Sequence, residues 1–124
     1  LELKITGVQL QADPTRLAQV FDNLLGNASK YAPGSPITIS LDQTDGMARI
    51  SVKDEGPGIP AEYLDRMFKR FFRVPGKNTS VRGTGLGLYI CRQIVQAHGG
   101  EISVESIYGQ GTTFYILLPY NKPT

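Results

Sequence analysis

Hydrophobic positions along the chain follow two different periods, and their succession predicts its elements. Residues 13–32 begin with an N-cap aspartate and a proline, and then carry apolar side chains at helical spacing. Residues 37–41 and 48–52 alternate apolar and polar side chains around "TDG", which predicts a β-hairpin. The apolar face of the predicted helix is formed by Leu17, Val20, Phe21, Leu24, Leu25 and Ala28.

The second half of the chain predicts two more helices and another hairpin. Residues 62–73 have helical spacing, whereas residues 74–83 are polar and rich in turn formers, which predicts a mobile loop. Residues 87–100 predict a long helix that ends at a double glycine. Residues 101–106 and 113–118 alternate again around the "YGQG" turn.

Strands mixed with two long helices, without regular βαβ alternation, indicate an α+β fold. We expect a two-layer α/β sandwich in which helices cover one face of a mixed, mostly antiparallel sheet. The sequence contains no internal repeat or linker, and 124 residues suit one compact domain spanning residues 1–124.

Composition excludes several classes of protein. Hydrophobic residues make up 40% and charged residues 19%, as is ordinary for a soluble globular domain. No apolar run reaches the roughly 18 residues of a membrane span, and the first residues lack the features of a signal peptide. One cysteine, Cys91, forms no internal disulfide and, with a single histidine, argues against a zinc site. We therefore expect a cytoplasmic domain without direct membrane contact.

The net charge of +2 is too small to indicate nucleic acid, but its distribution is uneven. Residues 62–82 contain six basic and two acidic side chains, which gives this window a charge of +4. Such an excess attracts a polyanion, although a solvated helix face has the same pattern. The basic residues of this window are Arg66, Lys69, Arg70, Arg73, Lys77 and Arg82.

The first predicted helix carries Asn23, Asn27 and Lys30 beside its apolar stripe rather than opposite it. Side chains in that position suit the rim of a cleft, although a solvated flank fits the same spacing. Amide oxygens are suitable ligands for magnesium, and lysine binds phosphate as a point charge.

The stretch "VKDEGPGIP" places Asp54 at the end of a strand, two residues before Gly56 and four before Gly58. A carboxylate there accepts a hydrogen bond from an exocyclic amine, and the glycines leave room for a flat ring. A plain turn built on Asp, Gly and Pro has the same composition.

The stretch "RGTGLGL" lacks the lysine and the spacing of a P-loop, and a polar loop precedes it where a dinucleotide fingerprint needs a strand. The lysine strand and catalytic-loop motifs of a protein kinase are also missing. What remains is a glycine loop, with the Thr84 hydroxyl in it, that leads into a helix N-terminus suited to phosphate. A ring at Asp54, phosphates at this loop and a metal at Asn27 together describe Mg-ATP.

The ordered stretches "NLLGNASKYA", "DEGPGIP", "MFKRFFR", "GTGLGL" and "GQGTTF" resemble the five sequence boxes of the catalytic ATP-binding domain of sensor histidine kinases. This domain is of the Bergerat or GHKL type, and the resemblance covers residues from about Asp13 to Leu118. It implies an α/β sandwich that binds ATP in a cleft beneath a mobile lid formed by residues 74–82.

The resemblance also implies roles for individual residues. Asn27 is the expected magnesium ligand, Asn23 contacts phosphate or metal-bound water, Lys30 contacts the phosphates and Tyr31 packs on adenine. Asp54 binds the adenine amine, with help from a water and from Thr112. Gly56 and Gly58 shape the adenine pocket. The other residues expected to contact ATP are Ile59, Phe68, Arg70, Lys77, Arg82, Gly83, Thr84, Gly85, Leu86, Gly87 and Leu88.

Histidine kinases transfer the γ-phosphate to a histidine on a separate two-helix dimerisation domain, and a response regulator acts downstream. No part of this sequence resembles that hairpin, and His98 in "QAHGG" is interpreted as a helix-terminal residue. We therefore expect a monomeric domain that binds ATP without phosphorylating itself, with no general base assigned. Cys91 is expected in the core.

Two alternatives stay open at this point. One is another GHKL-type ATPase or an anti-sigma serine kinase, and the other is a non-catalytic nucleotide-binding module. "MFKRFFR" and the "KY" after "NAS" favour the histidine kinase, and Asp22 is the one acidic residue between Pro14 and Tyr31.

Overall fold

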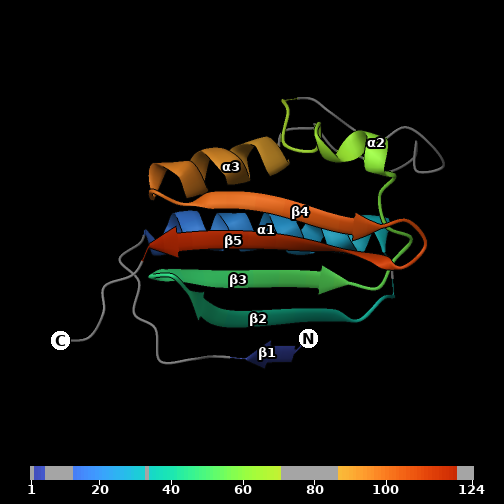
Figure 1. The fold of residues 1–124 in the computed structure, drawn as a ribbon, viewed down its shortest axis with the longest axis horizontal. Helices are drawn as coiled ribbons and strands as arrows, with labels where there is room; N and C mark the ends of the chain where they lie inside the picture. The colour runs from blue at the N-terminus through green and yellow to red at the C-terminus, as the bar shows by residue number, and fades with distance from the viewer. Residues whose placement is uncertain (1, 5–12, 33, 71–86, 120–124) are drawn as a thin grey trace.

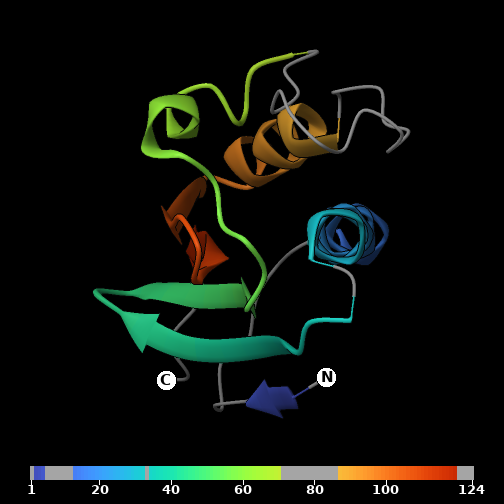
Figure 2. The same ribbon diagram turned by 90° about the vertical axis from the view of Figure 1, so that its right-hand side faces the viewer.

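The computed structural model describes residues 2–4, 13–32, 34–70 and 87–119, which form a sheet with helices over one face (Figures 1 and 2). The sheet has five strands in the order β1-β2-β3-β5-β4. The elements are β1 (Glu2–Lys4), α1 (Pro14–Tyr31), β2 (Ile37–Thr44), β3 (Met47–Asp54), α2 (Ala61–Leu64), α3 (Gly87–Ala97), β4 (Glu101–Ile107) and β5 (Gly111–Pro119).

The sheet confirms the predicted mixed, mostly antiparallel arrangement. Strands β2, β3, β5 and β4 pair antiparallel, and both predicted hairpins are present. Asp45 and Gly46 have positive φ angles of 47° and 77°, as the two-residue turn between β2 and β3 requires. The sequence did not predict β1, which pairs parallel to β2.

Helix α1 begins where the sequence predicted. The Asp13 carboxylate accepts hydrogen bonds from the N–H groups of Thr15 and Arg16, at 2.9 and 3.2 Å. These are two of the amides that a helix start leaves unpaired, and Pro14 occupies the first turn, where its missing N–H is not needed.

The end of α3 is tied to the start of α1 by His98. The Gly99 N–H binds the Gln96 carbonyl and the Gly100 N–H binds the Val95 carbonyl, which closes α3 with Gly99 in the left-handed region at φ 78°. The His98 ring donates from Nδ1 to the Ile94 carbonyl at 2.8 Å, and its Nε2 accepts from the Asp13 N–H at 3.1 Å. One neutral ring therefore satisfies backbone groups of two helices.

The predicted helix over residues 62–73 is much shorter in the structure. Helix α2 spans only Ala61–Leu64, and the following N–H groups of Arg66, Met67 and Lys69 bind carbonyls three residues earlier. These tighter turns bring Met67 into the core and set the Phe68 ring edge-on to Phe114 at 6.1 Å. Tertiary packing, rather than helical continuation, satisfies the apolar spacing here. Residues 71–73 lie outside the described residues.

The core lies between the inner face of the sheet and helices α1 and α3, which cover the same side (Figure 2). Alternate residues of the strands point into it, as the period-two pattern predicted. None of the described helices is both long and apolar enough to cross a membrane. The buried hydrophobic cluster consists of Val20, Leu24, Ile39, Ile50, Val52, Met67, Cys91, Ile94, Val95, Phe114, Ile116 and Leu118.

The outer face of the sheet carries a line of polar side chains across four strands. Asp42 and Arg49 are cross-strand neighbours and form a two-bond ion pair at 3.0 and 2.7 Å. The Arg49 guanidinium lies 5.9 Å from the centre of the Tyr115 ring, and the Tyr115 hydroxyl donates to Glu105 at 3.3 Å. The hydrogen bond from Arg49 lowers the pKa of Asp42. Because both partners are partly exposed, the pair adds little stability.

We expect His98→Ala to lower the free energy of unfolding by about 1–2 kcal/mol, because it removes the hydrogen bond from the Asp13 N–H at the start of α1 and the bond that holds the ring on the Ile94 carbonyl of α3. Urea denaturation followed by circular dichroism measures this change. Gln93→Ala, an exposed substitution on the same helix, is the control and should change stability by less than about 0.5 kcal/mol. Equal losses for the two variants would show that the His98 ring does not couple the helices.

Candidate functional site

Two polar side chains face each other at one end of the sheet. Asp54 is the last residue of β3, and it lies opposite Thr112 near the start of β5. They are 8% and 6% exposed, and they are the only polar or charged side chains classed as buried among the described residues. A buried carboxylate and hydroxyl next to each other need hydrogen-bonding partners, which marks this end of the sheet as the candidate site.

The loop after β3 folds back over the Asp54 carboxylate. Asp54 Oδ1 accepts from the Gly56 N–H at 2.9 Å, and the Glu55 N–H donates to Ser35 Oγ at 2.8 Å. Ser35 follows the end of α1, so this bond fixes the loop to the helix as well as to the strand. The backbone around the carboxylate is therefore held from two sides.

Gly56 is a glycine because helix α1 ends against it. A Cβ at this position would collide with the Cβ of Ala32 and would lie 3.2 Å from Asp54 Oδ1. The Cβ position of Gly56 thus faces the end of α1, and contact of Gly56 with an adenine ring stays a prediction. Gly56 therefore shapes the site by letting α1 approach the Asp54 loop.

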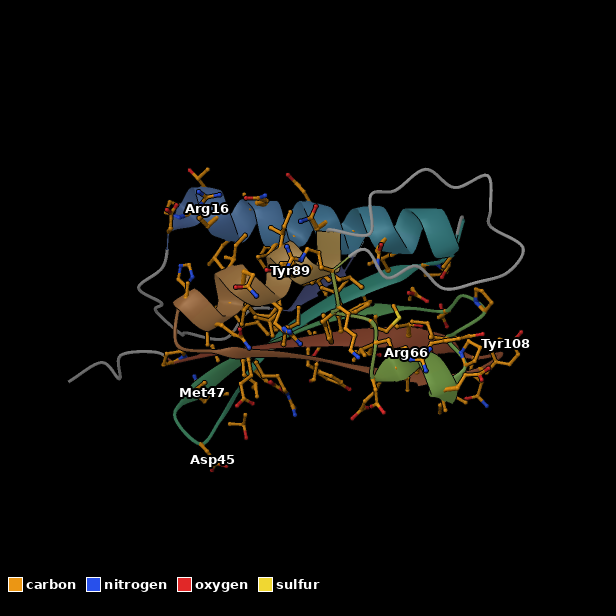
Figure 3. The ribbon with its side chains drawn as sticks, turned by 90° about the horizontal axis from the view of Figure 1, so that it is seen from above. Arg16, Asp45, Met47, Arg66, Tyr89 and Tyr108 are labelled. Atoms are coloured by element: carbon orange, nitrogen blue, oxygen red, sulfur yellow. The ribbon has the colours of Figure 1, made fainter. Side chains whose placement is uncertain are left out.

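The second half of the loop is attached to the turn between β4 and β5. Gly58 has a φ of 75°, and a Cβ there would collide with the Ile107 carbonyl. The Gly109 N–H donates to the Pro57 carbonyl at 2.6 Å, and the Ile59 N–H donates to Ser106 Oγ at 2.7 Å. Figure 3 shows this turn, marked by Tyr108, at the end of the molecule away from Asp45 and Met47.

The two predicted asparagines lie on α1 beside its buried face, as the helical spacing indicated. Both are half-buried, and Asn23 Nδ2 donates to the carbonyl of Gly87, the first residue of α3, at 3.4 Å. Burial raises the pKa of the nearby Cys91 thiol to about 11, against a smaller opposing effect of its hydrogen bond with Asn23. Cys91 is thus a core residue, as expected, and the thiol stays protonated at neutral pH.

Three residues expected to contact ATP have protein contacts in the structure. Phe68 packs edge-on to Phe114, and Leu88 packs against the core cluster. The Arg70 guanidinium lies 5.3 Å from the centre of the Tyr89 ring on α3. Contact of these three residues with a nucleotide stays a prediction.

The rest of the predicted site falls on residues that the structure does not describe in full. Lys30 and Tyr31 belong to α1, but their side chains lie outside the described part. The predicted lid, residues 74–82, is outside it altogether. The same is true of Lys77, Arg82, Gly83, Thr84, Gly85 and Leu86.

Sequence reasoning did not single out Ser35 or Ser106, although both bind the Asp54 loop. Serine occurs throughout the chain, so residue type alone did not distinguish them. The available signal was position. Ser106 is the last residue of the predicted strand, two residues before the "YGQG" turn, and it lies on the same face as the inward residues of that strand.

Comparison with known proteins gives the family. A family model described as histidine kinase-, DNA gyrase B- and HSP90-like ATPase matches residues 12–122. The sensor histidine kinase WalK of Bacillus subtilis is 45% identical over 117 residues, which covers 91% of this chain and 19% of WalK. The chain thus spans about a fifth of the length of the curated relatives it matches.

Solved structures agree with this match. The mycobacterial sensor histidine kinase MprB superimposes with a TM-score of 0.87 and is 35% identical, with 98% of this chain and 84% of that chain covered. Full-length ShkA, solved in complex with AMPPNP, has a TM-score of 0.83 and 30% identity, with 99% of this chain and 26% of that chain covered.

Gly58 and Gly34 offer a matched test of how the loop is held, because their φ angles are 75° and 76° but only Gly58 faces other atoms. We expect Gly34→Ala to lower the free energy of unfolding by about 1 kcal/mol through backbone strain alone. Gly58→Ala should cost about 1–3 kcal/mol more, because its Cβ meets the Ile107 carbonyl. Urea denaturation of both variants measures the difference, and equal losses would contradict the close packing of loop and turn.

Proposed function

The chain belongs to the family of histidine kinase-, DNA gyrase B- and HSP90-like ATPases and is an ATP-binding catalytic domain of the sensor histidine kinase type. From this premise we propose that it binds Mg-ATP at the Asp54 end of the sheet. It supplies the γ-phosphate to a histidine on a separate dimerisation and phosphoacceptor domain of the parent kinase, and that histidine serves a response regulator. We further propose that the domain works in the cytoplasm.

The buried pair of Asp54 and Thr112 is the observation that carries this proposal. Both lie at the same end of the sheet, and the second oxygen of Asp54 is not the one that accepts from the Gly56 N–H. A carboxylate accepts hydrogen bonds only, so the group it takes must be a donor, such as the exocyclic amine of adenine. The AMPPNP complex of ShkA supports an adenine nucleotide as the ligand of this domain type.

The half-buried amides of Asn23 and Asn27 suit the phosphate end of the nucleotide. Among the described residues no three His, Cys, Asp or Glu side chains come together as a metal site. The amide oxygens of Asn23 and Asn27 are ligands of the kind that magnesium accepts, since this ion takes few protein ligands and completes its shell with phosphate oxygens and water. We assign Asn27 as its protein ligand and Asn23 as a contact of phosphate or metal-bound water. When bound, the ion would supply positive charge that neutralises the phosphates.

The residues of this domain position the nucleotide and stabilise the charge on its phosphates. Helix α3 starts at Gly87 beside Asn23, and its first N–H groups and dipole favour phosphate oxygens there. Lys30 contributes a further positive charge and Tyr31 packs on the base. Thr84 and the glycines from Gly83 to Gly87 complete the phosphate loop. A histidine nitrogen of the partner domain would attack the γ-phosphorus in line while the bond from that phosphorus to the bridging oxygen breaks and ADP leaves, so positioning and charge stabilisation account for most of the catalysis.

We expect Asp54→Ala to weaken binding of a non-hydrolysable ATP analogue by about 10- to 100-fold, because a hydrogen bond to a charged acceptor is lost. Isothermal titration calorimetry with and without magnesium measures the change. Asp42→Ala is the matched control, since Asp42 lies on the outer face of the sheet and should leave binding unaltered. Unchanged affinity in a folded Asp54→Ala variant would refute the base site.

We also expect Asn27→Ala to abolish phosphoryl transfer to a purified two-helix histidine hairpin, because the protein ligand of the metal is removed. Transfer is followed with radiolabelled ATP. Arg16→Ala, an exposed change on the same helix, should leave the rate intact. Transfer by Asn27→Ala at the normal rate would remove Asn27 from the metal site.

A further inference from the structure

The hydroxyl of Ser106 has three close partners at the edge of the site. Ser106 Oγ lies 2.7 Å from the Ile59 nitrogen, 2.9 Å from the Gly111 carbonyl oxygen and 2.9 Å from Thr112 Oγ1. Ser106 is half-buried, and the Asp54 loop, the start of β5 and the end of β4 meet at this one oxygen.

The chemistry of the partners decides the direction of each bond. A hydroxyl has one proton to donate and two lone pairs to accept with. The Ile59 N–H can only donate, so it occupies one lone pair. The Gly111 carbonyl can only accept, so it takes the Ser106 proton. One lone pair remains, and Thr112 must therefore donate its own proton to Ser106.

This arrangement leaves Thr112 without a proton for the site. The Thr112 oxygen presents its lone pairs on the strand next to that of Asp54, at the position paired with it. The Asp54 carboxylate is itself an acceptor. The end of the sheet therefore offers acceptors from both buried side chains. A donor group placed between them is stabilised, and a carbonyl oxygen placed there is repelled and leaves buried groups unpaired.

We infer that Ser106 is a specificity-determining residue that fixes Thr112 as an acceptor, so that the site selects a purine nucleotide with an amino group at position 6 over one with a carbonyl. This inference rests on the proposed function. Ser106 acts through Thr112 and need not touch the base. Without Ser106, the Thr112 hydroxyl is free to turn its proton toward a carbonyl, and the discrimination weakens.

A purely structural role of Ser106 gives a different result. Ser106 also holds the Ile59 N–H, and through it the loop that covers Asp54. If holding the loop were the only role of Ser106, its removal would weaken the binding of amino purines and of carbonyl purines by the same factor. The ratio of the two affinities therefore separates the roles, whereas the affinity for ATP alone does not.

The experiment measures dissociation constants of non-hydrolysable analogues of ATP and of ITP, its 6-carbonyl counterpart, by calorimetry. In Ser106→Ala we expect the preference for the ATP analogue to fall about fivefold, the value of one neutral hydrogen bond. Ser106→Thr keeps the hydroxyl and should restore the preference. Ser103→Ala, on the outer face of the same strand, is the matched control and should preserve it.

If Ser106→Ala does not fold, Ser106→Cys answers the same question, because its thiol keeps the shape and is a weak acceptor. An unchanged preference in the folded variant overturns this inference alone. A wild-type domain that binds the ATP analogue without preferring it over the ITP analogue overturns it as well. A wild-type domain that binds neither analogue overturns the proposed function together with the inference.

Discussion

The burial of the Asp54 carboxylate at the end of β3 is the constraint on which the rest of the site depends. A carboxylate taken out of water is costly unless hydrogen bonds replace the lost hydration. The Gly56 N–H supplies one such bond only if the chain turns back directly after the strand. Helix α1 ends at that turn. Residue 56 must therefore be a glycine, because a Cβ there would collide with Ala32. Strand end, loop and helix end are thus fixed together by one polar group.

The larger pattern of the fold could be predicted from the sequence because it depends on local periodicity. The helix from Pro14, both antiparallel hairpins and the position of Asp54 at a strand end all follow from spacing within a few residues. The three-residue strand β1 is too short for an alternation to show, and it depends on pairing with a distant segment. The turns after Leu64 share the apolar spacing of a helix, because Met67 and Phe68 must reach the core in either conformation.

The site itself was predicted less completely, because its residues act across the sheet rather than along the chain. Gly56 and Gly58 indicated a close approach of the backbone, but sequence alone does not show what approaches. In the structure it is Ala32 in one case and the Ile107 carbonyl in the other. Ser106 became visible only once the register placed it against Gly111 and Thr112. Composition and motif order indicate the ligand, whereas strand register assigns the donors and acceptors that would bind it.

The two ends of the proposed nucleotide site are held by different parts of the molecule. Asp54 and Thr112 belong to paired strands, and their loop is bonded to the β4–β5 turn, so the base end is part of the sheet. Asn23 and Asn27 belong to α1, which contacts α3 at Gly87 and, through Asp13, at His98. In the proposed site, the residues assigned to the base lie on hydrogen-bonded strands, whereas the asparagines assigned to the metal and phosphates lie on a helix packed against another helix.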